Sequence, residues 1–161
     1  MKKSYRVGIA AGLIPALFKI ILFLTGYTEP FSGSYTNLAE LVVVIIAVPL
    51  AVYIERREND LLPFNTALKT GIATATFTAV IMGLFTYVYL RFINTSIQDN
   101  ALEEAIKYAR EQKLNAEETK KTVYGAVQFF SPSVQATTAL FWMMVTGGIA
   151  SILSAVVLRK E

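Results

Sequence analysis

Two ionisable side chains, Lys19 and Glu40, stand inside long apolar runs of this sequence. Lys19 belongs to the run Val7–Leu24, and Glu40 lies near the start of the run Leu38–Ile54. A charged side chain at mid-depth of a membrane helix costs about 3 kcal/mol on insertion scales, so each residue needs a partner or water. Together they form the candidate intramembrane polar site, of the kind that binds an ion or a small solute.

A direct ion pair between these two residues depends on their depths. With helix ends near residues 26 and 38, Lys19 lies about 10 Å below the boundary, and Glu40 lies about one turn inside the next helix. Side chains lean toward the N-terminus of their helix, which separates the two charged groups on antiparallel helices. The alternatives for Lys19 are carbonyl groups freed near Pro15, hydroxyl groups, water, or extension to the lipid headgroups.

Other reactive side chains are scarce. The sequence has no cysteine and no histidine, which excludes disulfides, thiolate nucleophiles, imidazole bases and Cys/His metal sites. It also lacks a phosphate-binding glycine loop, a Gly-x-Ser-x-Gly elbow and a His-Glu-x-x-His motif. We therefore predict no catalytic, metal-binding or cofactor-binding residue, no cofactor, and no enzymatic activity.

Three threonines recur at every fourth position, Thr70, Thr74 and Thr78, within the apolar run Ala67–Ile93. On a helix they lie on one face, where they form either a polar pathway or a row of locally bonded hydroxyls. Threonine in an apolar helix more often donates to the carbonyl one turn back, or to a neighbouring helix. We expect the second arrangement.

The composition places these residues in a membrane protein. Hydrophobic residues make up 54% of the chain, and the 17% that are charged gather in a few patches. The apolar runs predict four transmembrane helices, at about residues 5–26, 38–54, 67–93 and 134–158, in a single integral membrane domain over 1–161. A cleaved signal peptide is the alternative for the first run, which is long for that role and lacks a following small-residue cleavage site.

Small residues form stripes at helical spacing on three of the predicted spans. Helices in lipid associate where small side chains let their backbones approach, so these stripes predict the packing faces of a bundle. A face between two copies of the chain is the alternative. The stripe residues are Gly8 and Gly12 on the first span, Gly71, Ala75, Ala79 and Gly83 on the third, and Gly147, Ser151 and Ala155 on the fourth.

The polar segment 94–133 predicts an extramembrane helical hairpin between the third and fourth spans. Asn115 followed by Glu118 has the pattern of a capping box that opens its second helix. We expect the apolar side of the hairpin to rest on the bundle or on the membrane surface; one long helix kinked near Leu114 is the alternative. The fold class is therefore an all-α membrane protein with four transmembrane helices and this hairpin. The apolar face of the first hairpin helix is Leu102, Ala105, Ile106 and Ala109.

Basic residues concentrate at the N-terminus, in the turn after the second span and at the C-terminus. The first loop, residues 27–37, has none, and the polar segment is net acidic. Basic loops stay in the cytoplasm, so both termini are expected there. The net charge of +3 is small and spread over the chain, so the sequence does not favour binding to nucleic acid. The lipid bilayer is the expected partner, with a second copy or another membrane protein as further alternatives. The basic residues concerned are Lys2, Lys3, Arg6, Arg56, Arg57, Lys69, Arg159 and Lys160.

Four short motifs carry a family resemblance. Phe64-x-x-Ala67-x-Lys69-x-Gly71 enters the third span and Phe92-Ile93-Asn94 leaves it, Ala116-Glu117-Glu118 opens a helix, and Phe130-Ser131-Pro132 precedes the last span. In this order they resemble a family of small bacterial membrane proteins catalogued as domain of unknown function 4199. The resemblance covers nearly the whole chain. It implies a four-helix protein of the bacterial inner membrane, and it implies no activity and no site residues.

These observations favour a non-catalytic accessory, scaffold or regulatory membrane protein, because the spans lack reactive groups and the polar hairpin offers the largest exposed surface. A small oligomeric transporter or channel is the main alternative and rests on Lys19, Glu40 and the prolines within the spans. An enzyme is the least favoured class, since no nucleophile–base or metal-ligand constellation is visible.

Overall fold

A computed structural model describes residues 2–26 and 35–160 of the chain. Four of its helical stretches are long and apolar enough to cross a membrane, namely α1, α2, α3 continued by η1, and α6. The prediction of an all-helical chain with four stretches long and apolar enough to cross a membrane is confirmed for the described residues. In chain order the described elements are α1 (Lys2–Leu24), α2 (Tyr35–Glu58), α3 (Phe64–Val88), the π-helical segment η1 (Tyr89–Ile93), α4 (Ser96–Glu111), α5 (Ala116–Phe129) and α6 (Pro132–Leu158).

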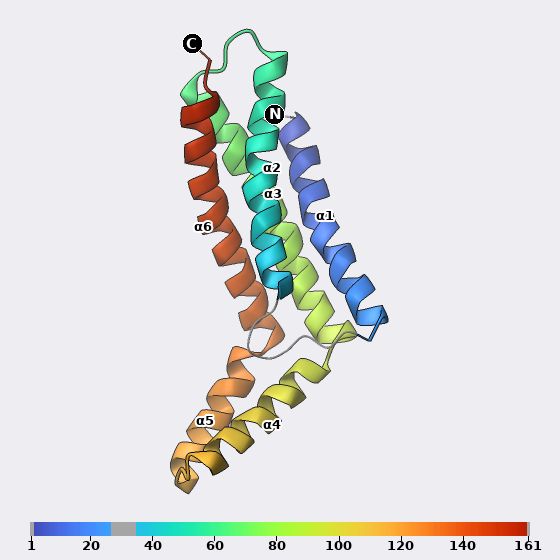
Figure 1. Cartoon of the computed structure of the whole chain (residues 1–161), viewed down its shortest axis with the longest axis vertical. Helices are drawn as coiled ribbons and strands as arrows, with labels where there is room; N and C mark the ends of the chain where they lie inside the picture. Colours follow the sequence, from blue (N-terminus) through green and yellow to red (C-terminus); the bar gives the residue numbers. More distant parts are fainter. Residues whose placement is uncertain (1, 27–34, 161) are drawn as a thin grey trace.

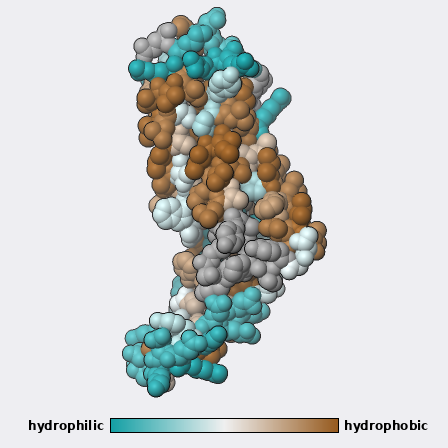
Figure 2. Space-filling model, in the orientation of Figure 1, coloured by the Kyte–Doolittle hydropathy of each residue, from teal (hydrophilic) through white to brown (hydrophobic). Residues whose placement is uncertain are grey.

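The four long helices lie side by side in one bundle, and α4 and α5 extend from one of its ends (Figure 1). Both termini and the turn between α2 and α3 lie at the opposite end. We call these the α4 end and the terminal end. Figure 2 shows apolar side chains along the bundle between hydrophilic groups at the terminal end and on α4 and α5. Large side chains such as Leu24, Leu84 and Val157 are exposed there, as expected for a surface that faces lipid tails.

Both ends of α2 differ from their predicted positions. α2 begins at Tyr35 rather than residue 38, so the last three residues of the predicted turn 27–37 are helical. The rest of that turn, residues 27–34, lies outside the described residues. α2 also continues to Glu58, because two arginines in its last turn complement the negative end of the helix dipole. Asn59 then closes the end, since its Nδ2 donates to the Glu55 carbonyl at 2.7 Å.

The contact between α3 and α6 is the most extensive in the bundle, and small residues on both helices make it possible. A methyl group on Gly71 would lie 2.8 Å from Cβ of Ser151, and one on Gly147 would overlap Cβ of Ala75. The backbones are therefore as close as side chains allow, and the two predicted stripes pack against each other within one chain. The remaining stripe residues Ala79, Gly83 and Ala155 are also buried.

α1 packs against α3 through its own glycines. A methyl group on Gly8 would lie 2.8 Å from the carbonyl oxygen of Thr74, and one on Gly12 would lie 2.8 Å from Cγ2 of Ile81. Such short distances show that a larger residue at either glycine would force the helices apart. Both glycines therefore lie at the contact between α1 and α3.

The threonine row of α3 joins this same interface. The Thr74 hydroxyl lies 2.9 Å from the Thr70 carbonyl and 3.4 Å from that of Ser4. The Thr78 hydroxyl lies 2.9 Å from the Thr74 carbonyl and 3.0 Å from that of Gly8. Each hydroxyl thus bonds one turn back and across to α1, as expected, and the row is part of a helix contact rather than a polar pathway.

A short backbone pairing closes the terminal end. The Leu62 N–H donates to the Lys160 carbonyl at 2.8 Å, and the Lys160 N–H donates to the Leu62 carbonyl at 3.0 Å. Leu62 is fully buried beneath this pairing and packs with Val52, Ala67 and Ala155. The end of the chain is therefore fixed to the turn between α2 and α3.

α4 and α5 are separate antiparallel helices that pack on each other, and we refer to them as the α4–α5 pair (Figure 1). Lys113 adopts a left-handed conformation (φ 51°), and the Leu114 N–H donates back to the Ala109 carbonyl, which ends α4 in a Schellman motif. Asn115 and Glu118 form the predicted capping box of α5. The alternative of one long kinked helix is therefore wrong.

The buried face of α4 differs slightly from the predicted one. Ala101, Ala105 and Ala109 are buried against α5, whereas Leu102 and Ile106 are only half-buried. Alanine at every fourth position lets the two helices approach closely, so the pair uses a narrow face for its own contact. That the wider apolar face rests on the bundle or on the membrane surface stays a prediction.

The α3–α6 contact yields a stability prediction. Replacing Ala75, which is buried against Gly147, with leucine should lower the free energy of unfolding in detergent by about 1–3 kcal/mol, because overpacking forces the backbones apart. Val80→Leu adds bulk on the exposed side of the same helix and should change the stability by less than about 0.5 kcal/mol. Equal losses in the two variants would show that the stripe is not the packing face.

Candidate functional site

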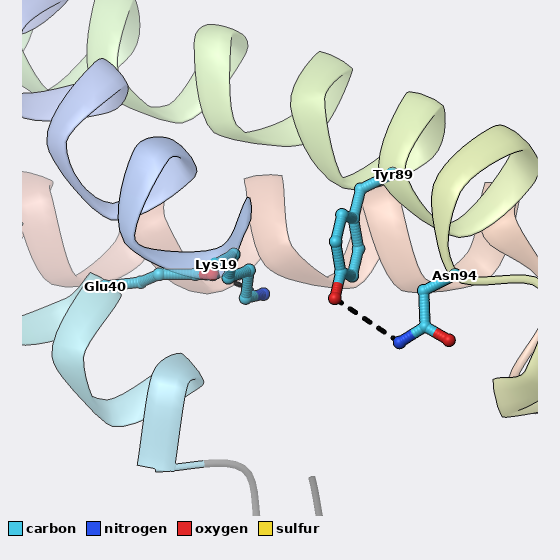
Figure 3. Close-up of polar contacts among 4 residues, drawn as sticks. All are labelled: Lys19, Glu40, Tyr89 and Asn94. Carbon is cyan, nitrogen blue, oxygen red and sulfur yellow. Dashed lines mark hydrogen bonds and ion pairs between the residues drawn. The ribbon is translucent and has the colours of Figure 1, made fainter. Parts of the chain in front are cut away.

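The α4 end of the bundle contains a buried ion pair between α1 and α2. Nζ of Lys19 lies 2.5 Å from Oε1 of Glu40, and the two side chains are 9% and 4% exposed. Figure 3 shows the two side chains meeting from neighbouring helices. Lys19 and Glu40 are therefore in direct contact, although the helix ends expected from the sequence put them at different depths.

The helix ends explain why the two residues meet. α1 ends at Leu24 and α2 begins at Tyr35, so Lys19 and Glu40 each lie five positions from the end of their helix (24 − 19 and 40 − 35). Five residues correspond to about 7.5 Å of helix, which puts both at the same depth. The expected separation is wrong because it rested on helix ends at residues 26 and 38.

Tyr89 lies beside this ion pair. The hydrogen bonds from Thr74 to Ser4 and from Thr78 to Gly8 each join residues that are 70 positions apart on the parallel helices α3 and α1. Tyr89 is also 70 positions after Lys19, so these two residues lie at about the same level of the bundle. The ring of Phe23, one turn beyond Lys19 on α1, contacts the Tyr89 ring edge-on with centroids 6.1 Å apart. Phe85 stacks on the other side at 5.6 Å. The phenol is held between aromatic rings, with its hydroxyl end near the ion pair (Figure 3).

Tyr89 also opens the π-helical segment η1. The Asn94 N–H donates to the Tyr89 carbonyl at 2.8 Å, and Asn94 Nδ2 donates to the Tyr89 hydroxyl oxygen at 3.3 Å. Ser96 in turn donates to Oδ1 of Asn94 at 2.8 Å. Tyr89 is 7% exposed, and its hydroxyl proton has no acceptor among the described residues. π-helical segments in α-helices occur frequently at functional sites.

Thr86 lies one turn before Tyr89 and adds a further buried hydroxyl. The residue is 6% exposed, and its Oγ1 has no hydrogen-bond partner in the described part of the chain. Leaving such a group unpaired costs about 1–3 kcal/mol. An additional polar atom at this position would therefore be stabilising.

The arrangement combines an ion pair with no net charge, two hydroxyl groups and a carboxamide. Such a group can bind a small polar molecule or water through hydrogen bonds, and the neutral pair keeps the cost of burial low. Within residues 2–26 and 35–160, no cluster of three or more acidic side chains is placed to hold a metal ion.

One family model matches nearly the whole chain. The model of the family described as protein of unknown function (DUF4199) matches residues 6–160. The chain belongs to this family. The resemblance seen in the sequence is thereby confirmed, and it extends through all four long helices and the α4–α5 pair. Neither the curated proteins nor the solved structures contain a match to this chain.

Three residues of the site, Thr86, Tyr89 and Asn94, were not predicted as site residues. Thr86 continues the four-residue spacing of the threonine row after one interruption at Met82, so extending that row would have found it. Tyr89 lies seven positions after the buried Met82, so helical spacing would have placed it on the same face. Asn94 joins the site through η1, and nothing in the sequence distinguishes a π-helical turn from an α-helical one.

The ion pair yields a second prediction. Lys19→Met leaves the Glu40 carboxylate buried without its partner and should lower the free energy of unfolding by about 3–5 kcal/mol. The double variant with Glu40→Gln should recover much of that loss, because it removes both charges. Chemical denaturation in detergent micelles measures this cycle.

A matched control is Lys69→Met, which removes a lysine from an exposed position on α3 and should change the stability by less than about 0.5 kcal/mol. Strictly additive losses in the cycle would show that the Lys19–Glu40 contact contributes nothing to stability.

Proposed function

We propose that this protein is a non-catalytic accessory, scaffold or regulatory protein of the bacterial inner membrane, in which the four-helix bundle anchors a docking surface for another protein. The α4–α5 pair forms that surface outside the membrane. The observation that carries this proposal is the exposure of large aromatic side chains on the α4–α5 pair. The surface of this pair is otherwise mostly hydrophilic (Figure 2).

Three aromatic side chains of the pair are more than half exposed: Tyr108 at 54%, Tyr124 at 68% and Phe129 at 53%. The pair packs through alanines on α4, so these rings are not needed for its own core. Aromatic residues are enriched at protein interfaces and supply much of the binding energy there. Alternating acidic and basic residues around them would provide the polar rim of such an interface.

The arrangement of the bundle supports an orientation with both termini in the cytoplasm. The two termini and the turn between α2 and α3 lie together at the terminal end, and the predicted cluster of basic residues belongs to these segments (Figure 1). Basic segments next to transmembrane helices are retained in the cytoplasm. The α4–α5 pair is then on the opposite side of the inner membrane.

Cysteine labelling tests this orientation without background, because the chain has no cysteine. Lys113→Cys at the tip of the α4–α5 pair should react with a membrane-impermeant maleimide in intact spheroplasts. Asp60→Cys, in the turn between α2 and α3, should react only after permeabilisation. Both positions are exposed, so a reversed labelling pattern would mean that the orientation is inverted.

The docking role predicts that the exposed tyrosines determine partner binding. The test is cross-linking of the full chain to its neighbours in native membranes. The Tyr108→Ala/Tyr124→Ala variant should bind the partner about tenfold or more weakly than wild type, so the cross-linked partner should disappear. Tyr53→Ala removes an exposed tyrosine from α2 and is the matched control. A cross-linked set that is the same in wild type, variant and control would contradict docking through this surface.

A small oligomeric transporter or channel is the second candidate, and the buried Lys19–Glu40 pair beside η1 favours it. Ionisable residues inside membrane spans often mark solute or ion pathways. Flux through proteoliposomes that Lys19→Met abolishes would support this candidate over docking.

A further inference from the structure

A groove with a volume of about 340 Å³ lies between α3 and α6, toward the α4 end of the bundle. Val80, Leu84 and Leu140 form apolar walls, and Gly83 and Ala136 keep the space between the helices open. Val80, Leu84 and Leu140 are exposed, so the groove opens on the surface that faces lipid. It is independent of the α4–α5 docking surface.

The polar groups of the groove gather at the α4 end. Tyr87 and Ser133 line it there, one on each helix. Arg91 follows Tyr87 after about one further turn, is exposed, and forms no ion pair with any described residue. The antiparallel register that sets Ala75 against Gly147 puts Tyr87 level with residue 135 (75 + 12 and 147 − 12). Arg91 lies beyond Tyr87 in η1, toward the end of the bundle where α6 begins. The groove thus passes from apolar walls to hydroxyl groups, and Arg91 follows beyond them on η1 without lining it.

We propose that this groove binds a phospholipid, with one acyl chain between α3 and α6 and the phosphate held by Arg91. Along the groove, the apolar walls come first and then the hydroxyl groups, with the cation beyond them. A phospholipid has the matching order of acyl chain, ester groups and phosphate. Arginine is well suited to the phosphate because its planar guanidinium donates two parallel hydrogen bonds. Tyrosine at the same level as the headgroup region is typical of membrane interfaces.

The shape of the groove and the cation beyond it favour an acyl chain over a helix from a second copy. The groove follows α3 from Val80 to Tyr87, which is about 10 Å or two turns of helix, and this is short for a contact between two membrane-spanning helices. A single hydrocarbon chain is much narrower than a helix and leaves the α3–α6 contact undisturbed.

The test is lipid binding to the full chain, purified in detergent, stripped of lipid and titrated with phosphatidylglycerol, with bound molecules counted by native mass spectrometry. One phosphatidylglycerol should bind more tightly than the others. Arg91→Gln should weaken this affinity about tenfold, as expected for the loss of a charged hydrogen bond. Ala136→Phe should fill the groove and remove the tight site; if that variant unfolds, Thr137→Phe fills the same groove from an exposed position.

Two controls match these variants. Lys107→Gln removes a positive charge from α4, and Gly148→Phe adds a ring on α6 where nothing lies within 4 Å, so both should keep the tight site. Diacylglycerol with the same chains should bind about tenfold more weakly than phosphatidylglycerol and should not respond to Arg91→Gln.

Equal binding of diacylglycerol and phosphatidylglycerol would overturn the role of Arg91. Unchanged phosphatidylglycerol binding in Arg91→Gln and in the groove-filling variant would overturn the site as a whole. A dimer that dissociates in the groove-filling variant would assign the groove to a second copy and likewise overturn the proposal.

Discussion

The close approach of α3 and α6 is the contact on which the rest of the bundle depends. Burial of apolar side chains gives little driving force within lipid, so helices must gain dispersion energy from backbones that nearly touch. Gly71 and Gly147 provide that approach at two successive levels. α2 then packs against both helices, where Val44 would lie 3.3 Å from a methyl group on Gly147, and α1 packs on the other face of α3. α3 is consequently the central helix, with a different set of small residues for each neighbour.

The buried ion pair is a consequence of this packing. Glycines and threonine hydroxyls fix α1 against α3 in one register, and α2 is fixed separately against α3 and α6. These contacts bring Lys19 and Glu40 to one depth, so the pair forms without distorting either helix. A shift of α1 by one turn would move Lys19 by about 5.4 Å and leave two charges buried without partners. The pair therefore makes that register much more favourable than its neighbours.

The parts of the fold that depend on local sequence patterns could be predicted, whereas those that depend on exact helix ends could not. The four spans and the stripe from Gly71 to Gly83 follow from length and spacing alone, and so does the capping box at Asn115. The Lys19–Glu40 contact depends on depth, and each residue of error in a helix end moves a charge by about 1.5 Å. Tyr89 lies seven positions after the buried Met82, so helical spacing alone puts it on the buried face of α3. Its bond to Asn94 depends on the extra residue that η1 adds to one turn, and that change has no recognisable residue pattern.

η1 connects the buried polar site to the exposed α4–α5 pair. The two candidate functions, scaffold and transporter, require different behaviour of this connection. Asn94 binds the Tyr89 hydroxyl and the Tyr89 carbonyl, and α4 begins only two residues later. In a scaffold, these bonds would hold α4 at a fixed angle to the bundle, and the buried pair would serve only to fix the helices that η1 rests on. In a transporter, Tyr89 and the Asn94 bonded to it would have to move if a solute reached the pair from the α4 end; in Figure 3, Tyr89 lies between Lys19 and Asn94. The two bonds from Asn94 to Tyr89 thus tie the start of α4 to the bundle, and docking through the α4–α5 pair would be transmitted to the bundle through them.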